Sequence, residues 1–198
     1  MQHRKRMPLL PALKTLADWR SDQIVVTTMG ASREWPKLSQ HPLDFHYIPS
    51  AMGHGPMLAL GLALALPERE VVAFNGDGCM LMGLGGLVTI VASAAKNLSL
   101  IVLDNGIYEV TGGQATAGAQ AAVDFAGVAR AAGFPAVAAF DNLHEWQSHA
   151  AEVLALPGPR FICLGVEPVG AEFQLSSPAP MADRIEKFRA ALANGVER

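Results

Sequence analysis

The stretch "FNGDGCMLMGLGG" (Phe74–Gly86) places Asp77 between two glycines, directly after the apolar run "EVVAF" (70–74). The run predicts a buried strand, and the residues from Gly78 onward predict the start of a helix. Gly76 and Gly78 allow a ligand to approach the backbone closely, and they allow backbone angles that other residues avoid. The unpaired N–H groups and the positive dipole end of a helix start favour a phosphate, which the carboxylate of Asp77 would repel. A divalent cation such as Mg²⁺ between them would remove that conflict.

A second stretch, "LDNGIYEV" (Leu103–Val110), ends the next apolar run, "LSLIVL" (98–103). The side chain of Asn105 and the main-chain carbonyl of Ile107 offer the neutral oxygens that Mg²⁺ accepts beside a carboxylate. Alone, "GDG" is more typical of a tight turn without a ligand. The motif is no Walker loop, because no Gly-Lys-Ser/Thr follows it, and its glycine spacing differs from the dinucleotide fingerprint. Two such stretches, each ending a predicted strand, favour a phosphate and metal site.

The whole chain alternates apolar runs with helical segments. We expect strands at 23–28, 44–48, 70–74, 98–103, 136–140 and 160–167, and helices at 11–20, 32–38, 53–66, 80–95, 123–133, 142–156 and 181–193. The helix at 32–38 is expected to be short and capped by Ser32. Continuous apolar strands predict an α/β fold, with a parallel sheet of about six strands and helices on both faces. The helices at 53–66 and 80–95 are so apolar that we expect them to be buried on most sides. Ligands bind beyond the carboxyl ends of such strands, where "TTMGAS" (27–32), "NGDG" and "DNGIY" all lie.

Composition narrows the class of protein. The chain has 198 residues, 51% of them hydrophobic, and a formal net charge of −3, which fits one domain with a substantial core. No basic stripe with interleaved aromatic residues indicates a nucleic-acid partner. The apolar start "PLLPALKTL" is too short, and too interrupted by Pro11 and Lys14, to predict a membrane span. Two distant cysteines make neither a disulfide framework nor a zinc site, so we expect a cytoplasmic protein.

The spacing of the two stretches resembles a known family. "GDG" at 76–78, then 25 residues, then "DN" at 104–105 is similar to the motif of the diphosphate-binding (PP) domain of thiamine-diphosphate-dependent enzymes. "TTMGASREW" (27–35), "SAMGHG" (50–55) and "DNGIYEVTGGQ" (104–114) are similar to segments of phosphonopyruvate and sulfopyruvate decarboxylases. The resemblance implies a single PP-type domain over residues 1–198, with its core at about 10–185. It also implies thiamine diphosphate and Mg²⁺ as cofactors, with Mg²⁺ held by Asp77, Asn105 and the carbonyl of Ile107.

The resemblance also implies roles for further residues. The Ser50 carbonyl would accept a hydrogen bond from the aminopyrimidine of the cofactor, and Met52 would be the apolar wedge that bends it. Cys79 would contribute its backbone N–H at the helix start, while its side chain is expected to be buried and structural. The complete set of cofactor-binding residues is then Gly30, Ser32, Ser50, Met52, Gly76, Asp77, Gly78, Cys79, Asn105, Ile107 and Tyr108.

Three polar residues have more than one interpretation each. His54 is a candidate catalytic residue that could shuttle protons, or it could cap the following helix or bind phosphate. Glu109 is a candidate acid/base, although a loop carboxylate is more often simply solvated. Arg33 could bind an anionic substrate tail, or it could form an ion pair with Glu34.

The family also needs a second domain, which carries a glutamate that activates the cofactor. No glutamate of this chain matches that position, so we expect a separate PYR-domain α-type subunit and a hetero-oligomer of α2β2 size or larger. The expected function is that of a carboxy-lyase subunit acting on a small 2-oxo acid such as 3-sulfopyruvate or phosphonopyruvate. A carboligase subunit of the acetolactate-synthase type and a non-catalytic cofactor-binding protein stay open as alternatives. A 2-oxoacid:ferredoxin oxidoreductase β subunit is disfavoured, because that class generally brings cysteines for an iron–sulfur cluster.

Overall fold

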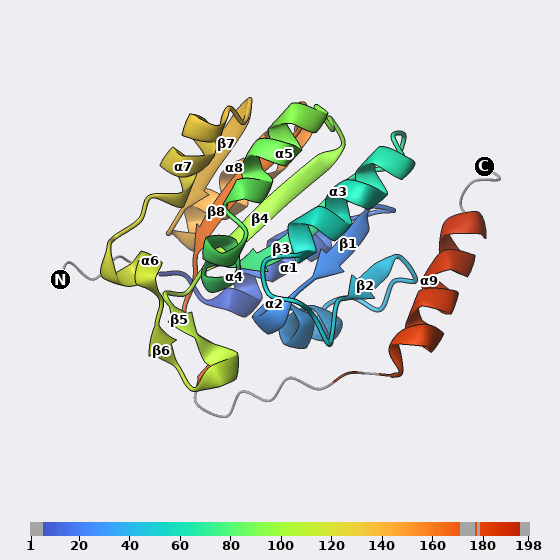
Figure 1. Ribbon diagram of the computed structural model, residues 1–198, viewed down its shortest axis with the longest axis horizontal. Helices are drawn as coiled ribbons and strands as arrows, with labels where there is room; N and C mark the ends of the chain where they lie inside the picture. Colours follow the sequence, from blue (N-terminus) through green and yellow to red (C-terminus); the bar gives the residue numbers. More distant parts are fainter. Residues whose placement is uncertain (1–5, 171–176, 178, 195–198) are drawn as a thin grey trace.

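A six-stranded parallel sheet crosses the protein in the order β2-β1-β3-β4-β8-β7 (Figure 1). The computed structural model describes residues 6–170, 177 and 179–194, so the two ends of the predicted domain 1–198 lie outside the described residues. The strands of the sheet are β1 (Ile24–Thr27), β2 (Asp44–His46), β3 (Val71–Gly76), β4 (Leu98–Asp104), β7 (Ala136–Phe140) and β8 (Arg160–Gly165). The predicted α/β fold with about six parallel strands is confirmed.

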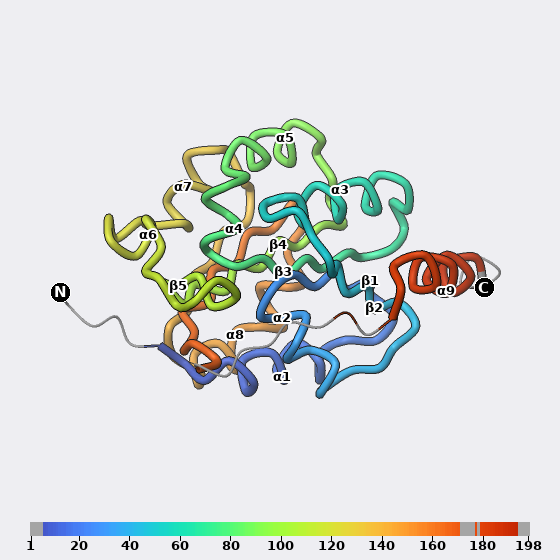
Figure 2. The backbone as a smooth tube through the Cα atoms, turned by 60° about the horizontal axis from the view of Figure 1, so that its bottom comes forward, coloured from blue at the N-terminus to red at the C-terminus, as the bar shows by residue number. Residues whose placement is uncertain are grey.

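Helices cover both faces of this sheet, as a second view shows (Figure 2). One face packs against α3 (Gly55–Ala65), α5 (Gly85–Ser93) and α7 (Phe125–Ala132), and the other against α1 (Leu9–Trp19) and α8 (Leu143–Ala155). Alternate residues of one strand serve the two cores: Val71 and Ala73 of β3 face the first, and Val72 and Phe74 face the second. Burial on both faces explains why these strands read as continuous apolar runs.

The helix predicted at 80–95 is wrong in one respect, because the structure divides it into α4 (Asp77–Met82) and α5. The break lies at Gly83, whose Cβ, if it had one, would stand 2.7 Å from the carbonyl oxygen of Gly53. Glycine is also a poor helix former, which favours an interruption at that point. The break lets the loop that precedes α3 pack closely against the end of α4.

The predicted burial of the two apolar helices on most sides is also wrong. Leu64 of α3 is 55% exposed, Met82 of α4 is 58% exposed and Val88 of α5 is 61% exposed. One side of each helix packs against the sheet. In the described part of the chain, no further layer of protein covers the opposite side, so its apolar side chains are exposed. None of the described helices combines the length and the apolarity that a bilayer crossing requires.

The helix predicted at 32–38 begins earlier than expected. It is observed as α2 (Met29–Glu34) followed by a 3-10 turn, η1 (Trp35–Lys37), and Thr28, not Ser32, occupies the N-cap position. Ser32 lies inside α2, and its hydroxyl is 2.9 Å from the hydroxyl of Thr27 at the end of β1. The residues that follow Ser32 therefore continue a helix that has already started.

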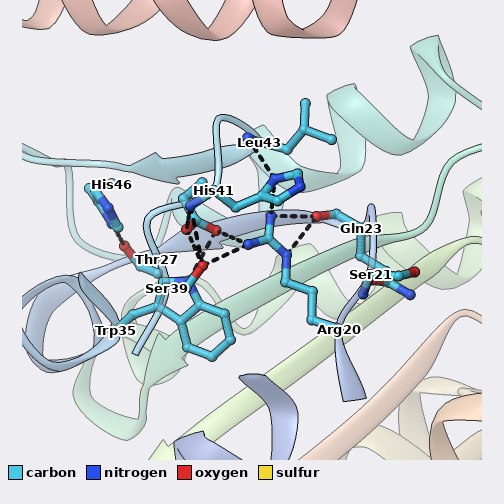
Figure 3. A network of polar contacts seen from close by, with 10 residues as sticks. Arg20, Ser21, Gln23, Thr27, Trp35, Ser39, His41, Leu43 and His46 are labelled. Atoms are coloured by element: carbon cyan, nitrogen blue, oxygen red, sulfur yellow. Dashed lines mark hydrogen bonds and ion pairs between the residues drawn. The ribbon is translucent and has the colours of Figure 1, made fainter. Parts of the chain in front are cut away.

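A buried ion pair fixes the edge strand β2 to the segment between α1 and β1 (Figure 3). Arg20 Nη1 lies 2.8 Å from Asp44 Oδ1, and both side chains are at most 5% exposed. Trp35 Nε1 donates to the same carboxylate at 3.0 Å, and Ser39 donates to its other oxygen at 2.6 Å. These contacts satisfy both oxygens of the Asp44 carboxylate and offset the free-energy cost of removing its charge from water.

The long segment after β4 forms a small unit of its own. It contains the two-stranded antiparallel hairpin of β5 (Ile107–Tyr108) and β6 (Gln114–Ala115), joined by the 3-10 turn η2 (Glu109–Thr111). We call residues 107–115 the hairpin. A short helix, α6 (Ala117–Gln120), follows it, and α9 (Met181–Asn194) lies at the other end of the molecule beside β2 (Figure 1).

Candidate functional site

A pocket lies at the carboxyl edge of the sheet, beyond the ends of β1, β3 and β4. The chain runs from β1 outward to β2 on one side and from β3 outward to β4 on the other, so this edge is a switch point where ligands bind in open α/β sheets. The three predicted strand ends therefore meet in space. The pocket is lined by Leu9, Thr28, Met29, Gly30, Ala31, Met52, Gly76, Asp77, Gly78, Cys79, Leu103, Asn105, Ile107, Tyr108, Glu109, Val110, Thr111 and Val166.

Asp77 lies at the base of this pocket and is 1% exposed. Thr116 donates its hydroxyl hydrogen to Asp77 Oδ2 at 2.8 Å. Burial, together with the negative charge of Asp104, raises the pKa of Asp77 to about 6 in spite of this hydrogen bond. A cation bound beside the carboxylate would offset both effects, because it would stabilise the charged form of the carboxyl group.

Asn105 is oriented by hydrogen bonds to its side-chain oxygen and to its main-chain carbonyl oxygen. Its Oδ1 accepts the N–H of Ile107 at 3.0 Å, which is an Asx-type turn. Arg6 donates to the carbonyl oxygen of Asn105, and its Nη2 lies 3.8 Å from Asp104 Oδ1. The next residue, Gly106, has a φ of +77°, which an L side chain rarely adopts. The turn thus presents Asn105 and Ile107 together at the pocket wall.

Gly78 is required by a close approach, but the approaching group is a protein side chain. A Cβ at Gly78 would stand 2.3 Å from Cε1 of Tyr108, so the tyrosine ring lies directly on this glycine. The expectation of unusual backbone angles is wrong, because Gly76 has a φ of −78° and Gly78 lies within α4. Cys79 is buried, and burial raises the pKa of its thiol, as befits a structural side chain.

Three predicted site residues lie outside the pocket lining. Ser32 is turned toward Thr27, whose hydroxyl also lies 2.8 Å from Nδ1 of His46. Ser50 has a buried hydroxyl without a hydrogen-bond partner among the described residues. His54 is exposed, its Nδ1 lies 3.2 Å from the carbonyl oxygen of Met52, and its side chain does not cap α3.

Glu109 lies in the pocket wall and is half-buried rather than freely solvated. Burial raises the pKa of its carboxyl group, while the N–H of Val169 and the charge of Arg33 oppose that shift. Arg33 forms an ion pair with Glu34, with its Nε 3.0 Å from Glu34 Oε1, which agrees with the second of the two roles expected for Arg33.

The charged side chains in the described lining of the pocket are all acidic. The lining contains the carboxylates of Asp77 and Glu109, and no lysine, arginine or histidine belongs to the part of the lining that the structure describes. No group of three or more His, Cys, Asp or Glu side chains in the described ranges could hold a metal ion. A metal here would therefore need amide and carbonyl oxygens beside one carboxylate, which suits Mg²⁺ and not zinc.

Sequence reasoning missed two residues of this site, Thr116 and Arg6. Thr116 reaches Asp77 across 39 positions of the chain, and Arg6 reaches Asn105 across 99 positions. Neither belongs to a recognisable motif. Only the position of Thr116 at the end of the glycine-rich stretch "TGGQAT" (111–116) offered a signal.

Comparisons with known proteins agree on the kind of domain. Residues 26–164 match a family described as the C-terminal TPP-binding domain of thiamine pyrophosphate enzymes. The chain is 40% identical over 179 residues to a phosphonopyruvate decarboxylase of Streptomyces viridochromogenes, which covers 88% of this chain and 44% of that protein. It is 36% identical over 164 residues to sulfopyruvate decarboxylase subunit beta of Methanothermobacter thermautotrophicus, covering 82% of this chain and 84% of that subunit.

The fold is also similar to solved structures. Benzoylformate decarboxylase from Polynucleobacter necessarius superposes with a TM-score of 0.70 at 19% sequence identity, over 89% of this chain and 36% of that chain. At this identity the likeness concerns the fold alone. The chain spans less than half the length of this structure and of the Streptomyces decarboxylase.

Proposed function

This chain belongs to the thiamine pyrophosphate enzymes, as a C-terminal TPP-binding domain, and from that premise we propose that it is the diphosphate- and Mg²⁺-binding subunit of a split 2-oxo acid decarboxylase. The family's domain binds thiamine diphosphate, and the relatives named above are decarboxylases. The proposal includes a single PP-type domain over residues 1–198 and a cytoplasmic location, both of which stay predictions.

One observation carries the proposal: the buried carboxylate of Asp77 shares its pocket with Asn105 and Ile107. A carboxyl group with a pKa of about 6 gains strongly from a nearby cation, and the other two residues offer neutral oxygens. We propose that Asp77, Asn105 and the carbonyl of Ile107 hold Mg²⁺.

The rest of the lining fits the cofactor itself. Gly30, Gly76, Gly78 and Cys79 would line its diphosphate, and Met52, on the loop before α3, would support its bent form. Thiamine diphosphate supplies, when bound, an electron sink for the carbon atom that loses CO₂. Tyr108 would have to shift its ring from Gly78 for a phosphate to approach that backbone closely.

An uncharged apolar surface supports a partner subunit. The helices α3, α4 and α5 lie together on one side of the sheet (Figures 1 and 2). The side chains of Leu64, Met82, Leu84 and Val88 in this region are exposed. The loop at Gly53 packs against Met82 and Gly83, so this surface continues to Met52 in the pocket wall. A partner bound there would reach the pocket and could bring the missing glutamate. Apolar surfaces of this kind are typical of protein interfaces.

The charge of the lining bears on the substrate. We propose a small 2-oxo acid with an anionic tail, such as 3-sulfopyruvate or phosphonopyruvate. Because the described lining has two carboxylates and no basic side chain, the cationic groups that bind this tail would come from the partner subunit. Of the two catalytic candidates, Glu109 lines the pocket and His54 does not.

The test begins with the intact assembly. The chain would be tagged at its C-terminus, purified from its native cell with Mg²⁺ and thiamine diphosphate, and assayed for CO₂ release from 3-sulfopyruvate, phosphonopyruvate and pyruvate. We expect a stoichiometric partner and CO₂ from one of these acids. Analysis of the other product separates decarboxylation from carboligation. A chain that holds the cofactor alone, with no partner and no turnover, would favour the non-catalytic alternative.

Two variants locate the partner surface. Val88→Asp places a charge on the apolar surface and should abolish co-purification of the partner while the chain stays folded. Leu156→Asp is the matched control, because Leu156 is also exposed but follows α8 on the opposite side of the sheet. Equal retention of the partner by both variants would exclude this surface as the docking site.

A further inference from the structure

We propose that Glu109 is a positioning residue whose carboxylate clasps the hairpin to the two neighbouring walls of the pocket. The proposal rests on the proposed function only where it concerns the cofactor, since the clasp is a property of this chain alone. It differs from the acid/base role expected from the sequence. Four features of the structure carry it: the partners of the carboxylate, the ring of Tyr108, the glycines around the hairpin and the place of Glu109 beside Asn105 and Ile107.

The carboxylate of Glu109 reaches two segments that are distant in the sequence. Its Oε1 accepts the N–H of Val169, which follows β8. Its Oε2 lies 3.2 Å from the position that a Cβ would take at Gly30, in the first turn of α2. The hydrogen bond at Oε1 therefore joins the segments that follow β4 and β8, while Oε2 faces Gly30 of α2, the segment that follows β1, where the charge of Arg33 attracts the carboxylate. An oxygen held in this way is poorly placed to exchange protons with a substrate.

The neighbouring residue, Tyr108, makes the second attachment of the hairpin. Its ring lies on Gly78, at the start of α4. Tyr108 thus holds the hairpin to the segment after β3, while Glu109 holds it to the segment after β8 and faces the segment after β1. Because a phosphate that approaches Gly78 would displace this ring, the contact of Glu109 is the attachment that would remain when the cofactor binds.

Glycines make the hairpin dependent on these attachments. Gly106 at its base has a φ of +77°, and Gly112 and Gly113 in its turn have φ values of +119° and +79°. The hairpin has only two residue pairs between its strands, Ile107 with Ala115 and Tyr108 with Gln114. A pair of strands this short is not stable without further contacts. The contacts of its side chains therefore decide where it lies.

The position of the hairpin matters because Asn105 and Ile107 stand at its base. If Glu109 releases Val169, the turn at Gly106 can rotate and move both oxygen donors away from Asp77. The clasp would then act on cofactor binding, and only through that on turnover.

Hydrogen exchange of the free chain tests the clasp without any cofactor. In Glu109→Ala, we expect the exchange of the Val169 amide and of residues 107–115 to rise by about tenfold, because the amide loses a charged acceptor. Glu109→Gln keeps an oxygen acceptor of the same shape and should exchange at an intermediate rate. Glu167→Gln, an exposed glutamate in the same segment as Val169, is the matched control and should be unchanged. Unchanged exchange in Glu109→Ala would overturn the proposal.

A second measurement separates positioning from catalysis. In the complex with its partner, Glu109→Ala should weaken the binding of thiamine diphosphate in the presence of Mg²⁺, measured by titration calorimetry, by about tenfold, while kcat at saturating cofactor changes little. Loss of kcat with unchanged exchange and unchanged cofactor affinity would assign Glu109 to catalysis instead. If the wild-type complex binds no thiamine diphosphate, the proposed function fails, and the exchange experiment still decides the clasp.

Discussion

Replacing Asp77 with asparagine tests whether burial of its charge weakens the free protein and prepares the pocket for a cation. Asparagine has nearly the same shape and can still accept the hydrogen bond that Thr116 donates at 2.8 Å. The change therefore removes the charge without creating a cavity. It also removes the repulsion between Asp77 and Asp104.

The size of the effect follows from the pKa. The carboxyl group of Asp77 has a pKa of about 6 in the folded protein, against 3.8 for its ordinary value. Each pKa unit is worth about 1.4 kcal/mol, so the buried charge costs about 3 kcal/mol of unfolding free energy once it is fully ionised. The folded state holds the Asp77 proton to a higher pH than the unfolded state. The free energy of unfolding is therefore highest below pH 3.8, and it falls by about 3 kcal/mol as the pH rises through about 6.

The assay is urea unfolding followed by tryptophan fluorescence, between pH 4 and pH 8, without divalent cations. Trp35 and Trp146 are fully buried, so their emission reports on unfolding of the core. We expect Asp77→Asn to match the wild type near pH 4 and to exceed it by about 3 kcal/mol near pH 8. The control is Asp18→Asn, an exposed carboxylate whose i,i+4 pair with Lys14 is worth only about 0.3 kcal/mol.

Two results would refute this reasoning. One is an asparagine variant that is no more stable than the wild type at pH 8. The other is a stability difference that does not change with pH, because the cost would then not arise from ionisation. Addition of Mg²⁺ extends the test: it should stabilise the wild type and leave Asp77→Asn unchanged.

Three further substitutions probe other parts of the structure. Gly78→Ala should destabilise the free protein by about 1–3 kcal/mol in urea unfolding, because its Cβ would stand 2.3 Å from the Tyr108 ring; the same loss in a Tyr108→Ala background would contradict that cause. Asp44→Asn should cost about 3–5 kcal/mol in the same assay, since it leaves the buried Arg20 without its opposite charge; a loss typical of a surface pair, below about 1 kcal/mol, would contradict it. Trp146→Ala should cost about 3–5 kcal/mol through the cavity it leaves, and calorimetry should show a lower Tm.

The fold and most of the pocket could be predicted from the sequence because they depend on local pattern. Apolar runs bounded by turns gave the strands, and the carboxyl ends of parallel strands share one edge of the sheet. This geometry brought Gly30, Asp77 and Asn105 to one pocket without any knowledge of the side-chain contacts. The roles proposed for them stay predictions.

The errors arose where packing overrode the pattern. α4 ends at Gly83, where the loop at Gly53 approaches the chain; the low helix propensity of glycine favours a break there, but residues 80–95 do not indicate the approach of that loop. The hydroxyl of Ser32 lies next to the hydroxyl of Thr27 and does not cap a helix, because the helix begins at Met29. In each case a neighbour from outside the segment decided the outcome.

The sequence by itself determined the α/β sheet, its apolar layers and the acidic residue at a strand end, because spacing along the chain is enough to fix these. Only the tertiary structure decided that Thr116 holds Asp77, that Glu109 reaches Val169, and that α3 and α5 expose apolar side chains such as Leu64 and Val88. Contacts between distant segments depend on how elements pack in space. An apolar helix sequence likewise predicts that the helix surface is shielded from water. It does not predict whether the core of the same chain or another subunit shields that surface.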